Sequence, residues 1–165
     1  MARVRVLYEA DGFGVGELLL EDDVLLWHEL PRPREAGSGT GLILSPTLLP
    51  SGEHPLATRL AAYFSGAPED FADVTLDLSW CTPFQLAVVT SLRGVGRGET
   101  VTYGELAALA GHPGASRAAG SFCAHNRFGI IVPCHRVVAA DGLGGYGSLG
   151  ADYKRRLLAL EGTTT

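Results

Sequence analysis

The chain has 165 residues, of which 46% are hydrophobic and 19% are charged, and its formal net charge is −5 at pH 7. This composition is typical of an ordinary globular protein with one domain or two small ones. No apolar run approaches the roughly 18 residues of a membrane-spanning helix, and the first residues lack the apolar core of a signal peptide. We therefore expect a cytoplasmic protein without membrane contact.

The first half of the chain is typical of β-structure followed by a loop and a helix. Alternating polar and apolar residues predict strands, a segment rich in Pro, Gly and Ser predicts a loop, and helical spacing of apolar residues predicts one helix. The expected strands cover 3–8, 12–20, 24–30 and 71–78, the loop covers 31–53, and the helix covers 54–63.

The second half is typical of short helices, expected over 84–92, 102–109, 115–124 and 152–160. Thr102 and Glu105 fit a capping box, and Gly111 followed by a His-Pro-Gly turn ends that helix. A helix, a short turn with glycine and a second helix form the outline of a helix-turn-helix, although an ordinary helical hairpin has the same outline.

The helix expected over 115–124 consists almost entirely of small residues, with Arg117 as the long side chain among them. Small residues allow close approach to a minor groove about 6 Å wide. They allow close packing against another helix equally well, so both interpretations stand.

Charge is distributed unevenly between the two halves. Residues 1–80 contain 5 basic and 13 acidic residues, whereas residues 81–165 contain 8 basic and 5 acidic residues. We place a domain boundary between these halves, giving domains 1–80 and 81–165. The basic second half allows a polyanionic partner, although ordinary scatter of surface charge gives the same count.

The three cysteines are Cys81, Cys123 and Cys134, and none is part of a CxxC pair. This pattern argues against a disulfide framework and against a cysteine-based metal site, so we expect no bound metal. Cys134 precedes His135 and Arg136. Because a free thiol is only about 3% ionised at pH 7, a neighbouring imidazole and guanidinium are the usual means of activating it. Adjacent side chains on a helix or strand do not face each other, so the pair alone is also compatible with a half-buried cysteine beside a surface histidine.

The motifs around Cys134 make the second half similar to the 6-O-alkylguanine-DNA alkyltransferases. The matching motifs, in the order and spacing of that family, are TPFQ at 82–85, GETVTY at 98–103, SRAAG at 116–120, Asn126, PCHRVV at 133–138, GGY at 144–146 and LALEG at 158–162. The resemblance is strong over about 81–162 and weak in the first half.

The resemblance implies an α+β fold. The N-terminal domain, 1–80, would be a ribonuclease-H-like small sheet with a helix. The C-terminal domain, 81–165, would be helical and winged-helix-like, with a helix-turn-helix that binds double-stranded DNA through the minor groove. The family also implies a monomer that assembles cooperatively on DNA.

The resemblance implies catalytic roles for five residues. Cys134 would accept the alkyl group, His135 would be its base through a bridging water, and Glu161 would orient the histidine. Asn126 would hold the backbone around the cysteine, and Tyr103 would crowd the target phosphate and donate a proton to the leaving guanine. In such a triad one residue orients the base, and the base removes the proton of the nucleophile.

The resemblance also implies residues that contact DNA and the damaged base. Arg117 would fill the space left by the extruded base, with Ser116, Ala118 and Gly120 beside it on the same helix. The guanine pocket would be lined by Val137, Tyr146, Gly147 and Ser148. Substrates would be 6-O-alkylguanine and 4-O-alkylthymine. Because the product is a thioether, we expect one turnover per molecule and no cofactor.

Four features depart from the family pattern: Gly96 and Arg127 stand where proline is common, Ala124 stands where many members have arginine, and 139–145 is one residue shorter. Three other functions remain open at this point. They are a lesion-flagging protein that does not transfer the alkyl group, a cysteine hydrolase using Cys134, His135 and Glu161, and a helix-turn-helix regulator.

Overall fold

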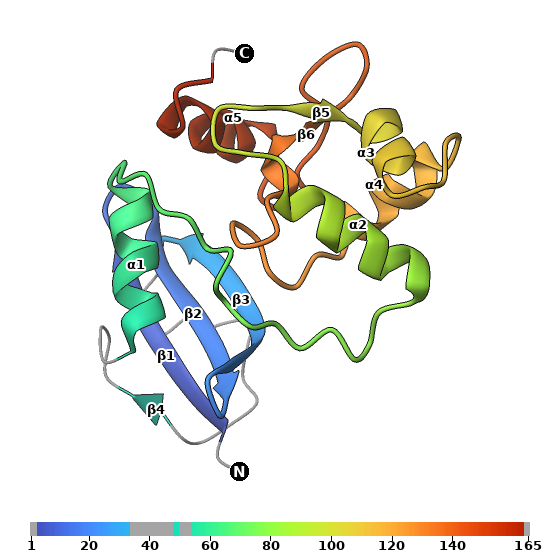
Figure 1. The fold of residues 1–165 in the computed structure, drawn as a ribbon. Coiled ribbons are helices and arrows are strands. Elements are labelled where there is room, and N and C mark those ends of the chain that lie inside the picture. Colours follow the sequence, from blue (N-terminus) through green and yellow to red (C-terminus); the bar gives the residue numbers. More distant parts are fainter. Residues whose placement is uncertain (1–2, 34–47, 50–53, 164–165) are drawn as a thin grey trace. The chain divides into compact units, whose positions relative to one another are not determined.

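A computed structural model of the chain describes residues 3–33, 48–49 and 54–163. Strands and helices follow one another in an α+β arrangement, as expected (Figure 1). The chain divides into two compact units, Met1–Asp77 and Leu78–Thr165. Trp80 belongs to the second unit, where its ring stacks on Phe122 and lies near Phe128. Among the described residues, no helix is long and apolar enough to cross a membrane.

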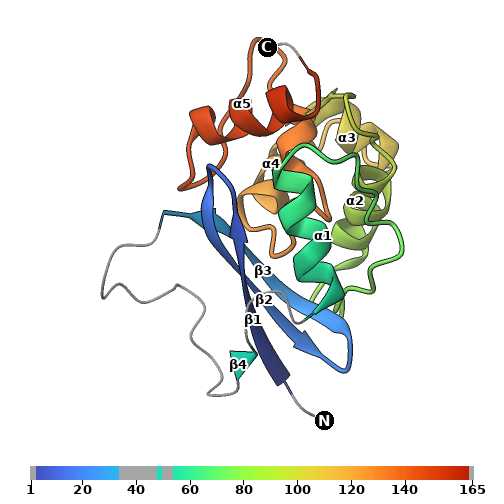
Figure 2. The ribbon, with the colours of Figure 1, turned by 90° about the vertical axis from the view of Figure 1, so that its left-hand side faces the viewer.

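The first unit is a four-stranded sheet with one helix. The strands β1 (Arg3–Ala10), β2 (Gly14–Glu21), β3 (Val24–Arg32) and β4 (Leu48–Leu49) lie in the order β3-β2-β1-β4. The first three pair antiparallel, whereas β4 pairs parallel to β1. Helix α1 (Pro55–Phe64) packs against β1, and both views show it lying along the sheet (Figures 1 and 2).

Local chemistry explains these elements. Asp22 and Asp23 both have positive φ, which is the geometry of a type I′ hairpin turn between β2 and β3. The side chain of His54 caps α1 by accepting the Leu56 N–H at 3.1 Å. The buried side of α1 repeats with helical period and faces the sheet. Its members are Leu56, Ala57, Leu60, Tyr63 and Phe64.

Two expectations for the first half are corrected. The segment 71–78 is not a strand, because only Leu76 bridges to Leu25, through backbone hydrogen bonds of 2.9 Å on either side of that pair. It begins instead with a turn, in which the Asp70 carboxylate accepts the Ala72 N–H. The expected loop 31–53 is strand at 31–32 and 48–49, and its parts 34–47 and 50–53 lie outside the described residues.

Among its described residues, the second unit contains four α-helices, one short 3₁₀ helix and a small parallel strand pair. Its elements are α2 (Pro83–Arg93), β5 (Val101–Thr102), α3 (Tyr103–Leu109), α4 (Ser116–Ala124), the 3₁₀ helix η1 (Cys134–Arg136), β6 (Val137–Val138) and α5 (Ala151–Leu160). The expected helices are all present within one or two residues of their bounds. The β5–β6 pair was not expected from the sequence. Because β5 leads directly into α3 and β6 directly follows η1, the pairing brings the segment that contains α3 and the segment that contains η1 together.

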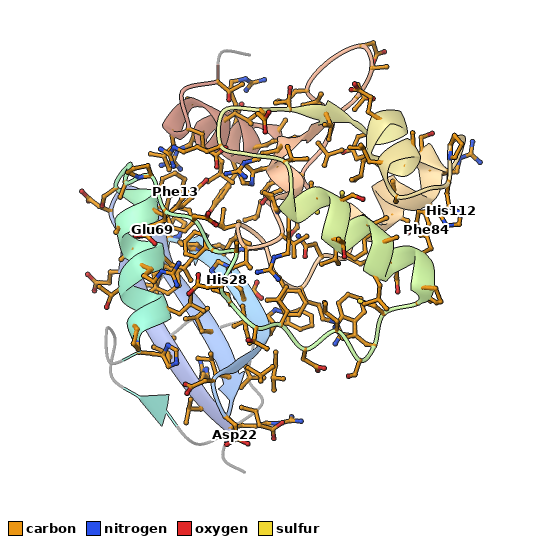
Figure 3. All side chains as sticks on the ribbon, in the orientation of Figure 1. Phe13, Asp22, His28, Glu69, Phe84 and His112 are labelled. Carbon is orange, nitrogen blue, oxygen red and sulfur yellow. The ribbon has the colours of Figure 1, made fainter. Side chains whose placement is uncertain are left out.

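Helices α3 and α4 form the expected helix-turn-helix outline. Thr102 and Glu105 make the reciprocal hydrogen bonds of a capping box at the start of α3. Gly111, with φ of 86°, ends α3 in a Schellman motif, in which the His112 N–H reaches the Ala107 carbonyl. Figure 3 shows Phe84 of α2 beside His112, with ring centroids 5.1 Å apart, so α2 supports this turn.

Replacing Gly16 by alanine should destabilise the first unit by about 1–3 kcal/mol. Gly16 pairs with Tyr8 across β1 and β2, and a Cβ at this position would lie 2.5 Å from the tyrosine ring. The ring cannot move without disturbing the buried hydrogen bond of 2.6 Å between the Tyr8 hydroxyl and His28. Urea denaturation measures the change. Gly142→Ala, where a Cβ meets nothing within 4 Å, is the matched control. Equal midpoints for the two variants would contradict the packing argument.

Candidate functional site

Cys134 is held at the end of a strained and tightly pinned segment of the second unit. The thiol is 3% exposed, and the apolar run before it is buried. Ile130 has φ of 76°, a conformation that a β-branched residue adopts only when its surroundings impose it. The surroundings here include the hydrogen bond of 2.8 Å from the Val132 N–H to the Phe128 carbonyl.

Asn126 provides the main restraint on this segment. Its side-chain amide donates to the Val132 carbonyl at 2.8 Å and to the Cys134 sulfur at 3.1 Å. Its side-chain oxygen accepts the Phe128 N–H at 2.9 Å. One side chain therefore holds both ends of the loop and also touches the thiol. These are the contacts of Asn126, for which the sequence predicted a role in holding this backbone.

His135 and Glu161 meet in the interior although 26 residues separate them in the chain. Nε2 of His135 lies 2.7 Å from Oε2 of Glu161, and neither side chain is exposed. Because a carboxylate only accepts, Nε2 carries the proton, and Nδ1 on the other edge of the ring is the basic nitrogen of neutral His135. Burial lowers the pKa of His135, and the hydrogen bond that His135 donates to Glu161 opposes that effect.

Arg136 completes this network. Its guanidinium donates to both carboxylate oxygens of Glu161, at 2.9 and 2.8 Å, and to the Val95 carbonyl at 2.7 Å. The paired geometry balances the buried negative charge of Glu161. The sequence analysis named Arg136 only as a neighbour of the cysteine. Its structural role, which joins η1 to the end of α5, could not be read from adjacency.

Cys134 opens onto a cavity of about 150 Å³. The lining residues are Tyr103, Gly120, Cys123, Ala124, Cys134, Gly145, Tyr146 and Gly147. Of the four expected pocket residues, Tyr146 and Gly147 line this cavity. Val137 is fully buried in β6, and Ser148 pairs with Tyr146 beside the cavity without lining it. Burial raises the pKa of Tyr103.

Lys154 is a functional candidate that the sequence analysis missed. This lysine has no exposed surface, donates to the Gly145 carbonyl at 3.1 Å, and lies 5.8 Å from the centre of the Tyr103 ring. Burial lowers its pKa, and the thiols of Cys123 and Cys134 oppose that effect. A signal was present, because Lys154 occupies the buried face of α5 with Tyr153, Leu157 and Leu158.

The electrostatic surroundings favour a neutral thiol at rest. Burial is the largest influence raising the pKa of Cys134, and the Cys123 side chain raises it further. The hydrogen bond from Asn126 and the positive charge of Lys154 act in the opposite direction. The surroundings therefore hold Cys134 as a neutral thiol.

Helix α4 has two different faces. Ser116, Arg117 and Ala118 are exposed, as a surface that contacts another molecule requires. Ala119 is fully buried, and the Cα of Gly120 faces the Tyr103 ring, where a Cβ would lie 3.7 Å away. The small residues of this helix thus serve internal packing on one side and leave a shallow surface on the other.

Two departures from the family pattern have local explanations. The Arg127 guanidinium lies 4.2 Å above the Trp80 ring, which is a cation–π contact. The Gly96 N–H donates to the Glu99 carboxylate at 2.6 Å, a hydrogen bond that proline cannot make. Among the described residues, no three His, Cys, Asp or Glu side chains gather where they could hold a metal ion.

Comparisons with known proteins agree with this geometry. A family model described as "6-O-methylguanine DNA methyltransferase, DNA binding domain" matches residues 83–163. A methylated-DNA–protein-cysteine methyltransferase of Mycolicibacterium paratuberculosis is 49% identical over 104 residues, which are 62% of this chain and 61% of that protein. The equivalent protein of Methanopyrus kandleri is 46% identical over 110 residues, which are 66% of this chain and 80% of that protein.

The fold is also similar to solved structures. The crystal structure of Mycobacterium tuberculosis OGT in complex with DNA has a TM-score of 0.78 and 36% identity, and the match covers 96% of this chain and 93% of that one. The sequence match to the mycobacterial relatives spans 61% of their length.

The free energy of unfolding should decrease on both sides of a plateau in pH. Below the ordinary His135 pKa of 6.5, the unfolded chain binds a proton that the folded chain rejects, so stability is lost as the pH falls. Above the ordinary Cys134 pKa of 9.0, the unfolded chain releases a proton that the folded chain retains, so stability is lost as the pH rises. Each group contributes a slope of at most about 1.4 kcal/mol per pH unit.

Urea denaturation at a series of pH values measures these slopes. His135→Gln should flatten the acid side and leave the alkaline side unchanged, whereas Cys134→Ser should flatten the alkaline side and leave the acid side unchanged, so each variant is the control for the other. Retention of the full slope in either site variant would contradict the assignment to that residue.

Proposed function

The chain belongs to the 6-O-methylguanine-DNA methyltransferase family, and from this premise we propose that it repairs alkylated DNA by transferring the alkyl group from guanine to Cys134. The observation that carries the proposal is the arrangement around the cavity. A buried thiol held by Asn126 faces a space that can admit an alkyl group, and the base His135, adjacent in the chain, is oriented by Glu161.

In the proposed reaction the Cys134 proton passes through a water molecule to Nδ1 of His135, since Glu161 occupies Nε2. The sulfur attacks the alkyl carbon bound to the guanine oxygen. The carbon–oxygen bond breaks, its electron pair stays with guanine, and Tyr103 supplies a proton to the leaving base. Lys154, beside both thiols, favours the developing thiolate. The alkyl group remains on sulfur as a thioether, which gives one turnover without a cofactor.

The target base has to leave the duplex before it can reach the cavity. Extrusion costs a few kcal/mol, and the cost is smaller for a damaged, poorly paired base. Arg117 is exposed on α4, where it can occupy the space that the base vacates. Ser116, Ala118 and Gly120 give the same helix a shallow profile suited to the minor groove. The same route serves 4-O-alkylthymine.

The proposal includes a finer description of the fold. The sheet and α1 of the first unit would be the family's ribonuclease-H-like domain. The α3–α4 pair with β5 and β6 would be its winged-helix-like DNA-binding unit. We further infer a cytoplasmic monomer that can assemble cooperatively on DNA.

The reaction is tested by incubating the protein with a duplex that contains one 6-O-methylguanine and measuring the intact mass. The wild type should gain about 14 Da, one methylene unit, and Cys134→Ser should gain nothing. Tight lesion binding without a mass gain would indicate a lesion-flagging protein. Multiple turnovers of an activated ester at Cys134 would instead indicate a hydrolase.

Arg117→Ala should slow repair of the duplex roughly tenfold or more. This corresponds to the loss of at least about 1.4 kcal/mol of stabilisation of the extruded state of the base. Transfer from the free base 6-O-methylguanine should be unchanged, because no stack has to be filled. Single-turnover rates on the two substrates measure the difference. Arg155→Ala, an exposed arginine of α5, is the matched control. Equal loss on duplex and free base would show that Arg117 acts on the cavity rather than on DNA.

A further inference from the structure

Cys123 is a second thiol in the wall of the cavity that contains Cys134. It lies in the last turn of α4, where its carbonyl accepts the Asn126 N–H at 3.4 Å. The Asn126 side chain in turn reaches the Cys134 sulfur at 3.1 Å. The Cys123 side chain is also close enough to Cys134 to raise the pKa of its thiol. The two cysteines therefore share one cavity, and the proposed alkyl transfer uses only one of them.

The two thiols differ in access to solvent. Cys123 is half-buried, whereas Cys134 is buried. A small oxidant from solution therefore reaches Cys123 first. Lys154 is close enough to both cysteines to interact with them electrostatically, and its positive charge acts to lower the pKa of Cys134. An accessible thiol beside a cation and next to a second thiol has the features of a cysteine that reacts with peroxides and is resolved by its neighbour.

We propose that Cys123 is a modification site for hydroperoxides and forms a reversible disulfide bond with Cys134. In the first step the Cys123 thiolate attacks one oxygen of hydrogen peroxide. The oxygen–oxygen bond breaks, a sulfenic acid forms, and hydroxide leaves and takes up a proton as water. In the second step the Cys134 sulfur attacks the Cys123 sulfur, the sulfur–oxygen bond breaks, and a second water leaves with the thiol proton. The peroxide gains two electrons, which come from the thiol pair.

The disulfide removes the thiol that the proposed function needs, and this consequence rests on that function. The bond also protects Cys134 from irreversible oxidation to sulfinic acid, because a disulfide is returned to two thiols by an ordinary dithiol reductant. Oxidised protein would thus be withdrawn from repair and restored later. Formation of the bond itself does not require alkyl transfer.

The test uses the full chain, reduced, freed of reductant and treated with hydrogen peroxide. Remaining thiols are blocked with N-ethylmaleimide, and the intact mass is measured with and without dithiothreitol. Only one of the three thiols of the wild type should remain available to N-ethylmaleimide. Apart from the mass of that label, the chain should be about 2 Da lighter, because two hydrogens are lost when the disulfide forms. Peptide mapping should place the bond between Cys123 and Cys134, and dithiothreitol added before the block should restore all three thiols.

Three variants separate this bond from other oxidation. Cys81→Ser, which changes a cysteine outside the cavity, should still form the bond. Cys123→Ser and Cys134→Ser should not form it, and the peptide map of the wild type decides the question if either fails to fold. Retention of all three thiols, a bond to Cys81, or a bond between two chains would overturn the proposal. A methyl-transfer assay on the untreated protein tests the proposed function separately, since the disulfide can form whether or not that assay succeeds.

Discussion

The buried carboxylate of Glu161 is the contact on which the candidate site depends. It lies at the end of α5 and binds His135 and Arg136, which follow the cysteine at the start of η1. Arg136 extends the network to the Val95 carbonyl after α2, and Arg97 binds the Leu160 carbonyl at the end of α5. The residues after α2, the helix η1 and the end of α5 are therefore joined around the carboxylate of Glu161. A buried charge that loses its partner destabilises a protein by several kcal/mol, so the network holds these segments in one arrangement.

The surroundings of Cys134 reconcile two opposing requirements. A nucleophile has to be available to its substrate, yet a thiolate exposed to solvent would react with any electrophile. Burial keeps the thiol neutral, whereas the Asn126 hydrogen bond and the charge of Lys154 act in the opposite direction, and the proposed transfer would use that influence once a base fills the cavity. The same cavity also contains Cys123. Because a second thiol lies in the same cavity, Cys134 can be oxidised to the proposed disulfide.

The supporting structure is built from short-range interactions. The capping box at Thr102, the Schellman motif at Gly111 and the glycine after α5 define where helices begin and end. Of these three, the Schellman motif at Gly111 lies in the turn through which α3 leads into α4. The short β5–β6 pair then places Tyr103, the first residue of α3, beside the segment that contains Cys134. Local signals therefore form the elements, and one two-residue pairing positions them for chemistry.

The sequence by itself determined the helices of the second half and the hairpin strands of the first half. These features depend on periodicity, caps and turns, which act over a few residues. It failed at 71–78, where apolar alternation resembled a strand but the tertiary fold offered only one bridge to Leu25. The family motifs named Cys134, His135, Glu161 and Asn126 as a site, but they could not supply the contacts among them.

Only the tertiary structure decided that Lys154 is buried at the cavity, that Arg127 stacks on Trp80, and that Cys123 adjoins Cys134. Each of these facts depends on which surfaces meet when separate helices pack. The physical reason is that side-chain burial and charge pairing are set by contacts between distant segments, whereas the sequence pattern reports only the local conformation of each segment.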